Sequence, residues 1–202
     1  MSFAHDPATH AYYDARAAEY DEWYEGTVVF AARDRPGWHD EVQRLTAFVD
    51  NLPEQRTLDV ACGTGFLTRH LKGFVVGLDQ SATMVAMAQR RIPNGLAVTG
   101  DALALPFADD TFDRVFTAHF YGHLVPDERA AFLAEARRVA PELVVVDSAG
   151  DEPDGWQTRR LNDGSEHRVY KRYLRAERLA AEIGGEPLLD GDWFSAARAV
   201  SR

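Results

Sequence analysis

Three carboxylates stand at or near the ends of short apolar segments. Asp59 lies inside segment 57–61, Asp79 follows segment 74–78, and Asp101 follows segment 96–99. If these segments are neighbouring parallel strands, the three acids lie at one edge of a sheet. A ribose diol and an adenine amino group each need a hydrogen-bond acceptor, and Asp59 is well placed for a cationic aminoacyl group. The spacing therefore predicts a site for a nucleoside-like ligand.

A glycine-rich turn follows the first of these segments. Gly63 and Gly65 allow the backbone to approach a ligand closely. A dinucleotide fingerprint needs a further glycine three residues after Gly65, where this sequence has Thr68. NAD is therefore disfavoured as the nucleoside-like ligand, and an NAD-dependent oxidoreductase is kept only as an alternative class of enzyme. Cys62, inside the turn, is interpreted as a small packed residue and not as a nucleophile.

Two histidines, His119 and His123, follow segment 112–118 at the expected carboxyl edge. Each histidine could position a substrate or remove a proton from it, and each could equally be a buried packing residue. Their spacing also suits a metal pair on a helix. Because no acid completes an H-E-x-x-H pattern, no metal is expected.

The elements that must position these residues alternate along the chain. Helices are expected over residues 40–49, 66–71, 81–91, 128–139 and 175–183, with strands between the middle ones and two closing strands near 187–189 and 193–200. This alternation predicts an α/β fold with a parallel sheet covered on both sides. We expect one domain over residues 1–202: a helical lid and cap (1–50), a cofactor-binding core (51–150), and a substrate-side segment that starts as a polar link and ends in the closing strands (151–202).

Composition narrows the class of protein. The 202 residues are 46% hydrophobic and 27% charged, with a net charge of −10, so a nucleic-acid partner is not expected. Segments long and apolar enough for a membrane span are absent from the sequence, and the single cysteine favours the cytoplasm. Monomer and homodimer both remain open.

The sign of the net charge is reversed in one segment of the chain. Residues 156–178 carry seven basic and three acidic side chains. This segment is either a solvated, salt-bridged face or a site for an anionic small molecule. Arg168 and Lys171 would share a face in a helical turn and would point to opposite sides in an extended strand.

Four stretches in order, L-D-V-A-C-G-T-G, G-L-D-Q-S, G-D-A-L-A-L-P-F and F-D-R-V-F, resemble the class I S-adenosylmethionine-dependent methyltransferases. The resemblance covers residues 12–200. It implies a Rossmann-like, doubly wound, mostly parallel seven-stranded sheet with an antiparallel final strand. It also implies a cofactor site formed by Asp59, Ala61, Gly63 and Gly65 around the methionine part, Asp79 and Gln80 at the ribose, Asp101 and Ala102 at the adenine, and Ala118. Ala61 replaces a glycine common in the family, so tighter packing is expected there.

Residues 12–21, 118–123 and 160–171 are similar to small actinobacterial O-methyltransferases that act on small molecules, phosphonates among them. In that group an N-terminal helical segment forms a lid. The similarity implies Tyr12 and Tyr20 as cofactor contacts and Tyr13, Tyr24 and Tyr121 as substrate contacts. An aromatic helix simply docked on the core is the alternative.

These observations predict an enzyme that transfers a methyl group from S-adenosylmethionine to an oxygen, or alternatively a nitrogen, of a small anionic metabolite, releasing S-adenosylhomocysteine. His119 and His123 are the expected catalytic residues, and Arg160, Arg168 and Lys171 the expected anion contacts. The alternatives are a cofactor-binding protein without turnover and a methyltransferase for a neutral phenol or amine.

Overall fold

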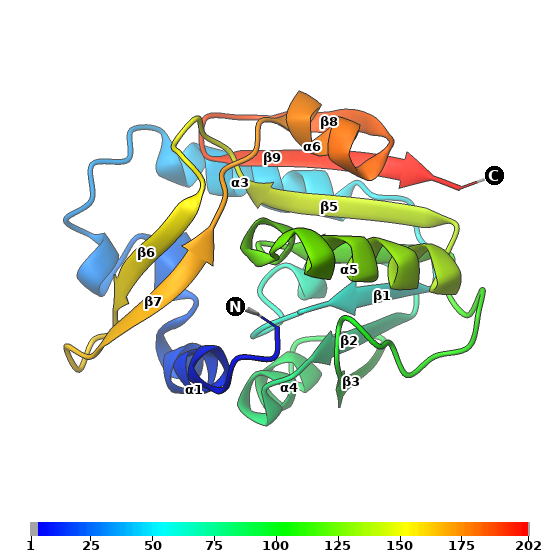
Figure 1. Ribbon diagram of the computed structural model, residues 1–202, viewed down its shortest axis with the longest axis horizontal. Coiled ribbons are helices and arrows are strands. Elements are labelled where there is room, and N and C mark those ends of the chain that lie inside the picture. The colour runs from blue at the N-terminus through cyan, green and yellow to red at the C-terminus, as the bar shows by residue number, and fades with distance from the viewer. Residues whose placement is uncertain (1–3, 202) are drawn as a thin grey trace.

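A seven-stranded sheet organises the chain in the computed structural model, which describes residues 4–201. The strand order is β3-β2-β1-β4-β5-β9-β8 (Figure 1). The strands are β1 (Thr57–Val60), β2 (Val75–Asp79), β3 (Gly95–Thr99), β4 (Arg114–Ala118), β5 (Glu142–Ser148), β8 (Glu186–Asp190) and β9 (Phe194–Val200). β1 to β5 pair in parallel, and the final strand β9 is antiparallel to both of its neighbours. The predicted mostly parallel Rossmann-like sheet is confirmed.

Helices cover both faces because the central strands are apolar on both sides. In β5, Leu143 and Val145 pack in one core cluster, whereas Val144 and Val146 pack in the other. The first cluster includes residues of α5 (Pro126–Val139) and α6 (Ala176–Ile183), and the second includes residues of α3 (Trp38–Asp50) and α4 (Ala82–Gln89). Figure 1 shows α5 in front of the sheet and α3 behind it.

The N-terminal helices and a hairpin extend beyond the carboxyl edge of the sheet (Figure 1). The helices are α1 (Pro7–Arg16) and α2 (Glu22–Glu25), with short 3-10 turns at η1 (Ala17–Glu19) and η2 (Val28–Phe30). Asp6 caps α1 by accepting a hydrogen bond from the Thr9 N–H. The helix packs against the hairpin. N-terminal helices are therefore present as expected, and their opening as a lid stays a prediction.

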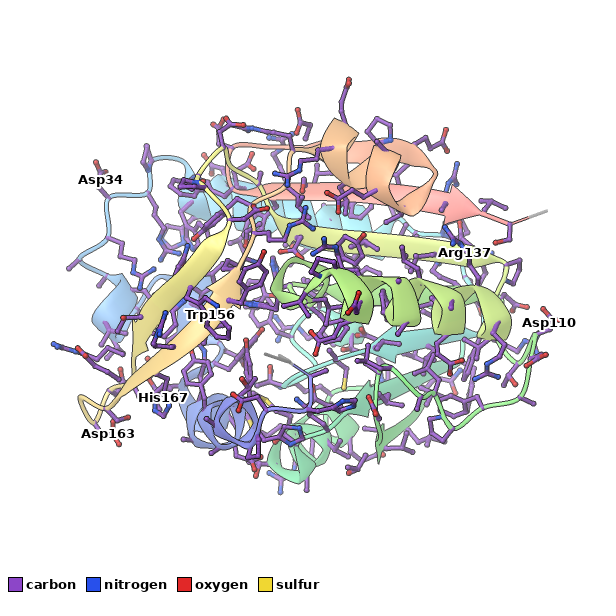
Figure 2. The ribbon with its side chains drawn as sticks, in the orientation of Figure 1. Asp34, Asp110, Arg137, Trp156, Asp163 and His167 are labelled. Atoms are coloured by element: carbon purple, nitrogen blue, oxygen red, sulfur yellow. The ribbon has the colours of Figure 1, made fainter. Side chains whose placement is uncertain are left out.

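Residues 151–175 differ from the expected polar link. They contain the antiparallel hairpin β6 (Gly155–Arg160) and β7 (Glu166–Lys171), whose turn carries Asp163 (Figure 2). Both strands are so rich in charged and polar residues that their alternation does not read as a buried strand. Extended β7 also settles the geometry of Arg168 and Lys171: Lys171 is buried and Arg168 is exposed.

One expected helix is replaced by a shorter turn. In place of a helix over residues 66–71, the chain makes only the 3-10 turn η3 (Thr68–His70), because the glycine-rich turn occupies the residues before it. After β4 a second 3-10 turn, η4 (Tyr121–His123), carries the second histidine. Among the helices of residues 4–201, none has the length and apolarity of a membrane span.

A buried ion pair fixes the hairpin to the sheet. Lys171 Nζ on β7 lies 2.5 Å from Asp147 Oδ1 on β5, and both side chains are almost fully buried. The same carboxylate accepts hydrogen bonds from the backbone N–H groups of Gly122 (2.6 Å) and Ser148 (2.8 Å). Although burial opposes ionisation, the charge of Lys171 holds the pKa of Asp147 below its usual value.

Replacing Lys171 by methionine removes one partner and leaves the buried carboxylate without its cation. We expect the free energy of unfolding to fall by about 3–5 kcal/mol. Urea unfolding measures this loss, and Arg168→Met on the exposed side of the same strand is the control, with a change within about 0.5 kcal/mol. Equal stability of the two variants would show that the pair does not anchor the hairpin.

Candidate active site

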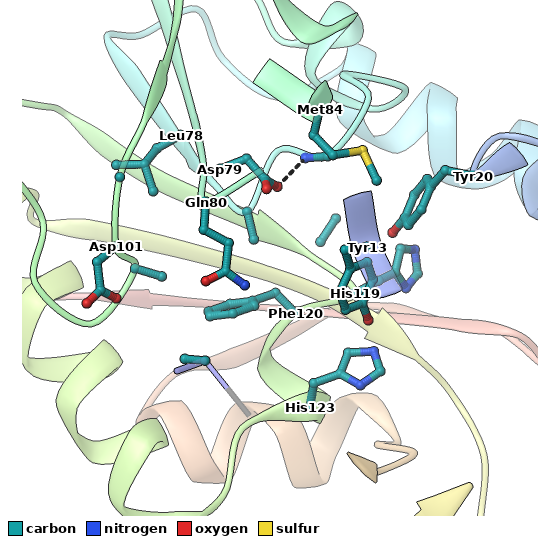
Figure 3. Close-up of a pocket in the computed structure, with 16 residues that line it drawn as sticks. Tyr13, Tyr20, Leu78, Asp79, Gln80, Met84, Asp101, His119, Phe120 and His123 are labelled. Carbon is teal, nitrogen blue, oxygen red and sulfur yellow. Dashed lines mark hydrogen bonds between the residues drawn. The ribbon is translucent and has the colours of Figure 1, made fainter. Parts of the chain in front are cut away.

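A cavity of about 630 Å³ lies at the carboxyl ends of the central strands, and we call it the first cavity. Residues that follow four different strands line it: Ala61, Asp79, Asp101 and His119. In Figure 3, Gln80 and Asp101 lie on one side of the cavity and His119 and Tyr20 on the other. Open α/β sheets bind ligands in this position, outside the carboxyl ends of their strands.

Asp79 ties the glycine-rich turn to the end of β2. Its Oδ2 accepts a hydrogen bond from the Gly63 N–H (2.9 Å, Figure 3), and its Oδ1 accepts one from the Ser81 N–H (2.9 Å). Ser81 in turn caps α4. Burial raises the pKa of Asp79 above its ordinary value, and the two N–H groups act against that rise. The carboxylate is thus fixed at the cavity wall and can accept further hydrogen bonds there.

The turn after β1 is built from left-handed residues. Ala61, Gly63 and Gly65 have φ of 58°, 55° and 81°. A Cβ at Gly65 would lie 3.0 Å from Ala88 Cα, so this glycine allows the turn to pack on α4 and does not line the cavity. Ala61 lines the cavity in a conformation that glycine adopts more easily, at the position where the family commonly has glycine.

Asp59 lies deeper, beside a smaller third cavity lined also by Tyr24 and Ala118. Thr68 Oγ1 donates a hydrogen bond to Asp59 Oδ2 at 2.6 Å. Burial raises the pKa of Asp59 to about 7. Among the described residues, Thr68 is the only hydrogen-bond partner of this buried carboxylate, so its other oxygen can accept a cationic group.

The opposite end of the first cavity holds Asp101 and Ala102, which follow β3. Asp101 Oδ1 accepts a hydrogen bond from the Leu103 N–H (2.8 Å), and Oδ2 lies 2.9 Å from His5 Nε2. Asp101 is half exposed at this end. Gln80 also lines the cavity, as does Ala118 at the end of β4. The expected adenine and ribose residues therefore surround one space.

A second cavity of about 950 Å³ adjoins the first, because Tyr13, Tyr20, His119 and His123 line both. Its other walls are aromatic and basic and come from the N-terminal helices, the hairpin and the segment before α3: Tyr12, Arg16, Trp23, Phe30, Arg33, Arg35, Trp38, Arg159, Lys171, Tyr173 and Trp193. One space with fixed carboxylates thus opens beside another with several cations.

His119 stands where the two cavities meet (Figure 3). Its backbone is left-handed, with φ of 56°, and neither ring nitrogen has a hydrogen-bond partner among the described residues. Burial lowers the pKa of His119 to about 3, so the ring is neutral at pH 7. A strained residue with a buried, unpartnered polar side chain at a cavity is typical of a functional site.

His123 is held more firmly. Its Nδ1 lies 2.5 Å from the carbonyl oxygen of Tyr170, which can only accept, so Nδ1 carries the proton. Burial, together with nearby Lys171, holds the pKa of His123 well below its usual value. His123 therefore links η4 to the hairpin while it lines both cavities.

The structure brings together most of the residues expected at the site. Tyr13 and Tyr20 line both main cavities, Tyr12 and Lys171 line only the second, and Tyr24 lines the third. Three expected substrate residues lie elsewhere. Tyr121 is buried in the core, with its hydroxyl 3.3 Å from Glu182, while Arg160 pairs with Glu166 and Arg168 lies over the Trp156 ring on the exposed side of the hairpin.

Sequence reasoning missed four arginines of the second cavity: Arg16, Arg33, Arg35 and Arg159. The inward position of Arg159 follows from the extended conformation of β6, which the sequence does not indicate. In β6 the partly buried residues are Gly155, Gln157 and Arg159, so strict alternation directs Arg159 inward and Arg160 outward. The other three lie before the sheet, in segments without a period that points to a cavity. Residues 4–201 contain no group of three or more His, Cys, Asp or Glu arranged to hold a metal.

Comparison with known proteins agrees with the fold. Residues 58–142 match the family model described as a methyltransferase domain. Demethylmenaquinone methyltransferase of Mycolicibacterium paratuberculosis is 33% identical over 183 residues, which are 87% of this chain and 71% of the relative. The Thermotoga maritima enzyme of the same name is 34% identical over 102 residues, 48% of this chain and 44% of that protein. The chain thus spans less than half of some curated relatives.

Among solved structures, a complex of DhpI with SAM and HEP has a TM-score of 0.72 and 28% identity, and the match covers 95% of each chain. A DhpI complex with SAH gives 0.71 and 29% identity, covering 96% of this chain and 95% of DhpI. DhpI is the dehydrophos O-methyltransferase. The chain belongs to the class I S-adenosylmethionine-dependent methyltransferases. The resemblance inferred from its four motifs is confirmed, and its structural relatives bind the expected cofactor.

Asp79→Ala removes a carboxylate that we expect to accept hydrogen bonds from the cofactor's ribose. The affinity for S-adenosylhomocysteine should fall about ten- to hundred-fold, as expected for the loss of charge-assisted hydrogen bonds worth about 1.5–3 kcal/mol. Isothermal titration calorimetry measures this change. Because Asp79 also fixes the turn, Asp79→Asn serves as the second variant, and wild-type affinity in both folded variants would rule out the assignment.

The pKa of Asp59 gives a pH dependence with a definite sign. Since burial holds this pKa at about 7, binding a cationic amino group must displace a proton below that pH. The affinity for S-adenosylhomocysteine should therefore rise as the pH increases from about 5 to 7 and then level off. Calorimetry across this range tests the trend, and Asp59→Asn should flatten it. An equally steep slope in the variant would assign the proton to another group.

Proposed function

We propose that this protein transfers a methyl group from S-adenosylmethionine to an oxygen of a small, anionic metabolite. The observation that supports this function best is the junction of two cavities at His119. The first has carboxylates at strand ends, and the second has several cations and aromatic rings. A donor and an acceptor bound in these two spaces would meet beside His119.

The residues of the first and third cavities fit the cofactor. Asp59 would accept the amino group, Asp79 and Gln80 the ribose hydroxyls, and Asp101 with Ala102 the adenine. Gly63 supports the fit. Its backbone is left-handed, and a Cβ at this position would lie 3.8 Å from the Tyr20 ring and would take up space between two walls of the first cavity. When bound, the cofactor supplies a methyl group on an electrophilic sulfonium centre.

The chain must then hold the acceptor in line and keep water away. Tyr13, Tyr20 and the neutral ring of His119 enclose the junction. With a pKa of about 3, His119 is a weak base and is better suited to orienting an acceptor by a hydrogen bond. A carboxylate or another oxyanion needs no base, because it is already ionised at pH 7. This protonation state favours an anionic acceptor over a neutral phenol or alcohol.

Two rivals follow from the comparisons and from the sequence. The curated relatives are named for demethylmenaquinone, which makes this compound the rival acceptor. A cofactor-binding protein without turnover is the rival function. An assay of S-adenosylhomocysteine release distinguishes both rivals from the proposal. The acceptors tested are small carboxylic and phosphonic acids, a phenol, an amine and demethylmenaquinone. Release with an anionic acid supports the proposal, and binding of the cofactor without release on any acceptor contradicts it.

His119→Ala should lower kcat for the acceptor about ten- to hundred-fold and leave the affinity for S-adenosylhomocysteine within twofold, because the ring orients the acceptor and not the cofactor. The wild-type kcat, measured at saturating cofactor, should be independent of pH between about 6 and 8.5, since His119 stays neutral in this range. Steady-state kinetics across pH tests both points. If the wild-type rate instead changed with pH around 6.5, and this change disappeared in His119→Ala, His119 would be the general base.

A further inference from the structure

Four arginines of the second cavity have no carboxylate partner. Arg16 lies on α1, Arg33 and Arg35 lie between η2 and α3, and Arg159 lies on β6. Within residues 4–201, none of the four forms an ion pair, whereas Arg172, Arg175 and Arg178 in the same basic segment all do. Among the other described arginines, Arg69, Arg90, Arg137 and Arg168 also lack an ion pair, but none of these lines the second cavity.

Three of these guanidinium groups gather around one side chain, Phe30. The distance from the ring centre to the guanidinium carbon is 4.8 Å for Arg33, 5.5 Å for Arg16 and 5.9 Å for Arg35. Arg159 is near enough that, after desolvation, its charge is the largest cause lowering the pKa of Arg33. Four like charges from three separate segments of the chain therefore repel one another at this cavity.

The polar groups around them do not compensate for this charge. Arg16 donates a hydrogen bond to the Tyr12 hydroxyl, but its buried Nε has no partner among the described residues. Arg35 donates to the Trp23 and Phe30 carbonyls, which are neutral. Glu152 is the one acidic residue among those that line the cavity, and it is exposed, while Lys171 is already paired with Asp147.

Flat aromatic side chains make up most of the remaining walls of the second cavity. Trp38 contacts Trp23 and Trp193 edge to face, with ring centres 5.0 and 5.8 Å apart. Trp23 also packs edge to face on His119 at 4.8 Å. The aromatic wall therefore runs from the arginines, where Arg35 lies 3.7 Å from the Trp38 ring centre, to the junction of the two cavities.

We propose that Arg16, Arg33, Arg35 and Arg159 bind the methyl acceptor, and that this acceptor is a flat, apolar ring carrying two negatively charged oxyanion groups. The inference rests on the proposed function and specifies its substrate class. One carboxylate can engage a pair of guanidinium forks and leaves the other two without an anion, whereas two anionic groups can together engage all four. The ring would lie along the tryptophan wall, with one oxyanion oxygen near His119.

Isophthalate is the probe, because it is a flat ring with two carboxylates, both ionised at pH 7.5. Calorimetric titrations compare it with benzoate, which has one charge, and glutarate, which has two charges and no ring, all in the presence of saturating S-adenosylhomocysteine. We expect isophthalate to bind at least tenfold more tightly than either. Benzoate or glutarate binding as tightly as isophthalate would overturn the inference.

Variants test the residues. Arg33→Gln and Arg159→Gln should each weaken isophthalate binding about ten- to hundred-fold, since each removes charge-assisted hydrogen bonds. Arg160→Gln and Arg168→Gln make the same change of charge on the exposed side of the same hairpin and should leave the affinity within twofold. Unchanged affinity in both cavity variants, or an equal loss in the control variants, would also overturn the inference.

The affinity for S-adenosylhomocysteine separates this inference from the function on which it rests. It should be the same in all four variants, because none of these arginines lines the first cavity. If the cofactor product binds and isophthalate does not, the substrate class is wrong and the proposed methyl transfer still stands. If the cofactor product does not bind to the wild-type protein, the proposed function itself fails.

Discussion

The carboxylate of Asp147 joins the parts of the molecule that make the second cavity. It extends from β5 and holds three groups at once: Lys171 of the hairpin, the N–H of Gly122 in η4, and the N–H of Ser148. A Cβ at Gly122 would lie 2.9 Å from Asp147 Oδ1, so the approach requires glycine at this position. The hairpin and the turn with the histidines therefore share one anchor in the sheet, and the cavity between them depends on it.

The distribution of ion pairs explains how a basic cavity exists in an acidic chain. Arginines outside the cavity are mostly neutralised by nearby acids, as in the contacts of Arg138 with Glu135 and Asp109. Exposed pairs of this kind contribute little to stability, but they remove positive charge from the surface. The positive potential is left where the arginines lack partners. An anion that approaches the protein would therefore be attracted to this cavity more than to the general surface.

The sheet could be predicted from the sequence because its central strands are short and apolar and alternate with helical segments. Their parallel arrangement placed Asp79 and Asp101 around the first cavity and Asp59 beside the third cavity, which shares Ala61 and Ala118 with the first. The second cavity could not be predicted in the same way. It is built from α1, the segment before α3 and a hairpin rich in charged residues, which meet only in three dimensions. Composition located the cations near residue 160, but only the register of β6 separates Arg159 from Arg160.

Backbone strain marks the edge where the two cavities meet. Ala61 after β1 and His119 after β4 are both left-handed, although neither is glycine, and such residues cost about 1–3 kcal/mol each. Backbone hydrogen bonds hold the chain there: the His119 N–H donates to the Val146 carbonyl at 2.9 Å, and the Cys62 N–H donates to the Leu78 carbonyl at 3.0 Å. Since β1 and β4 are neighbours, the two strained residues stand side by side at the cavity wall. A fold that keeps two such turns together sacrifices stability for the position of His119, and this is the arrangement expected where a neutral imidazole must orient an acceptor beside a bound cofactor.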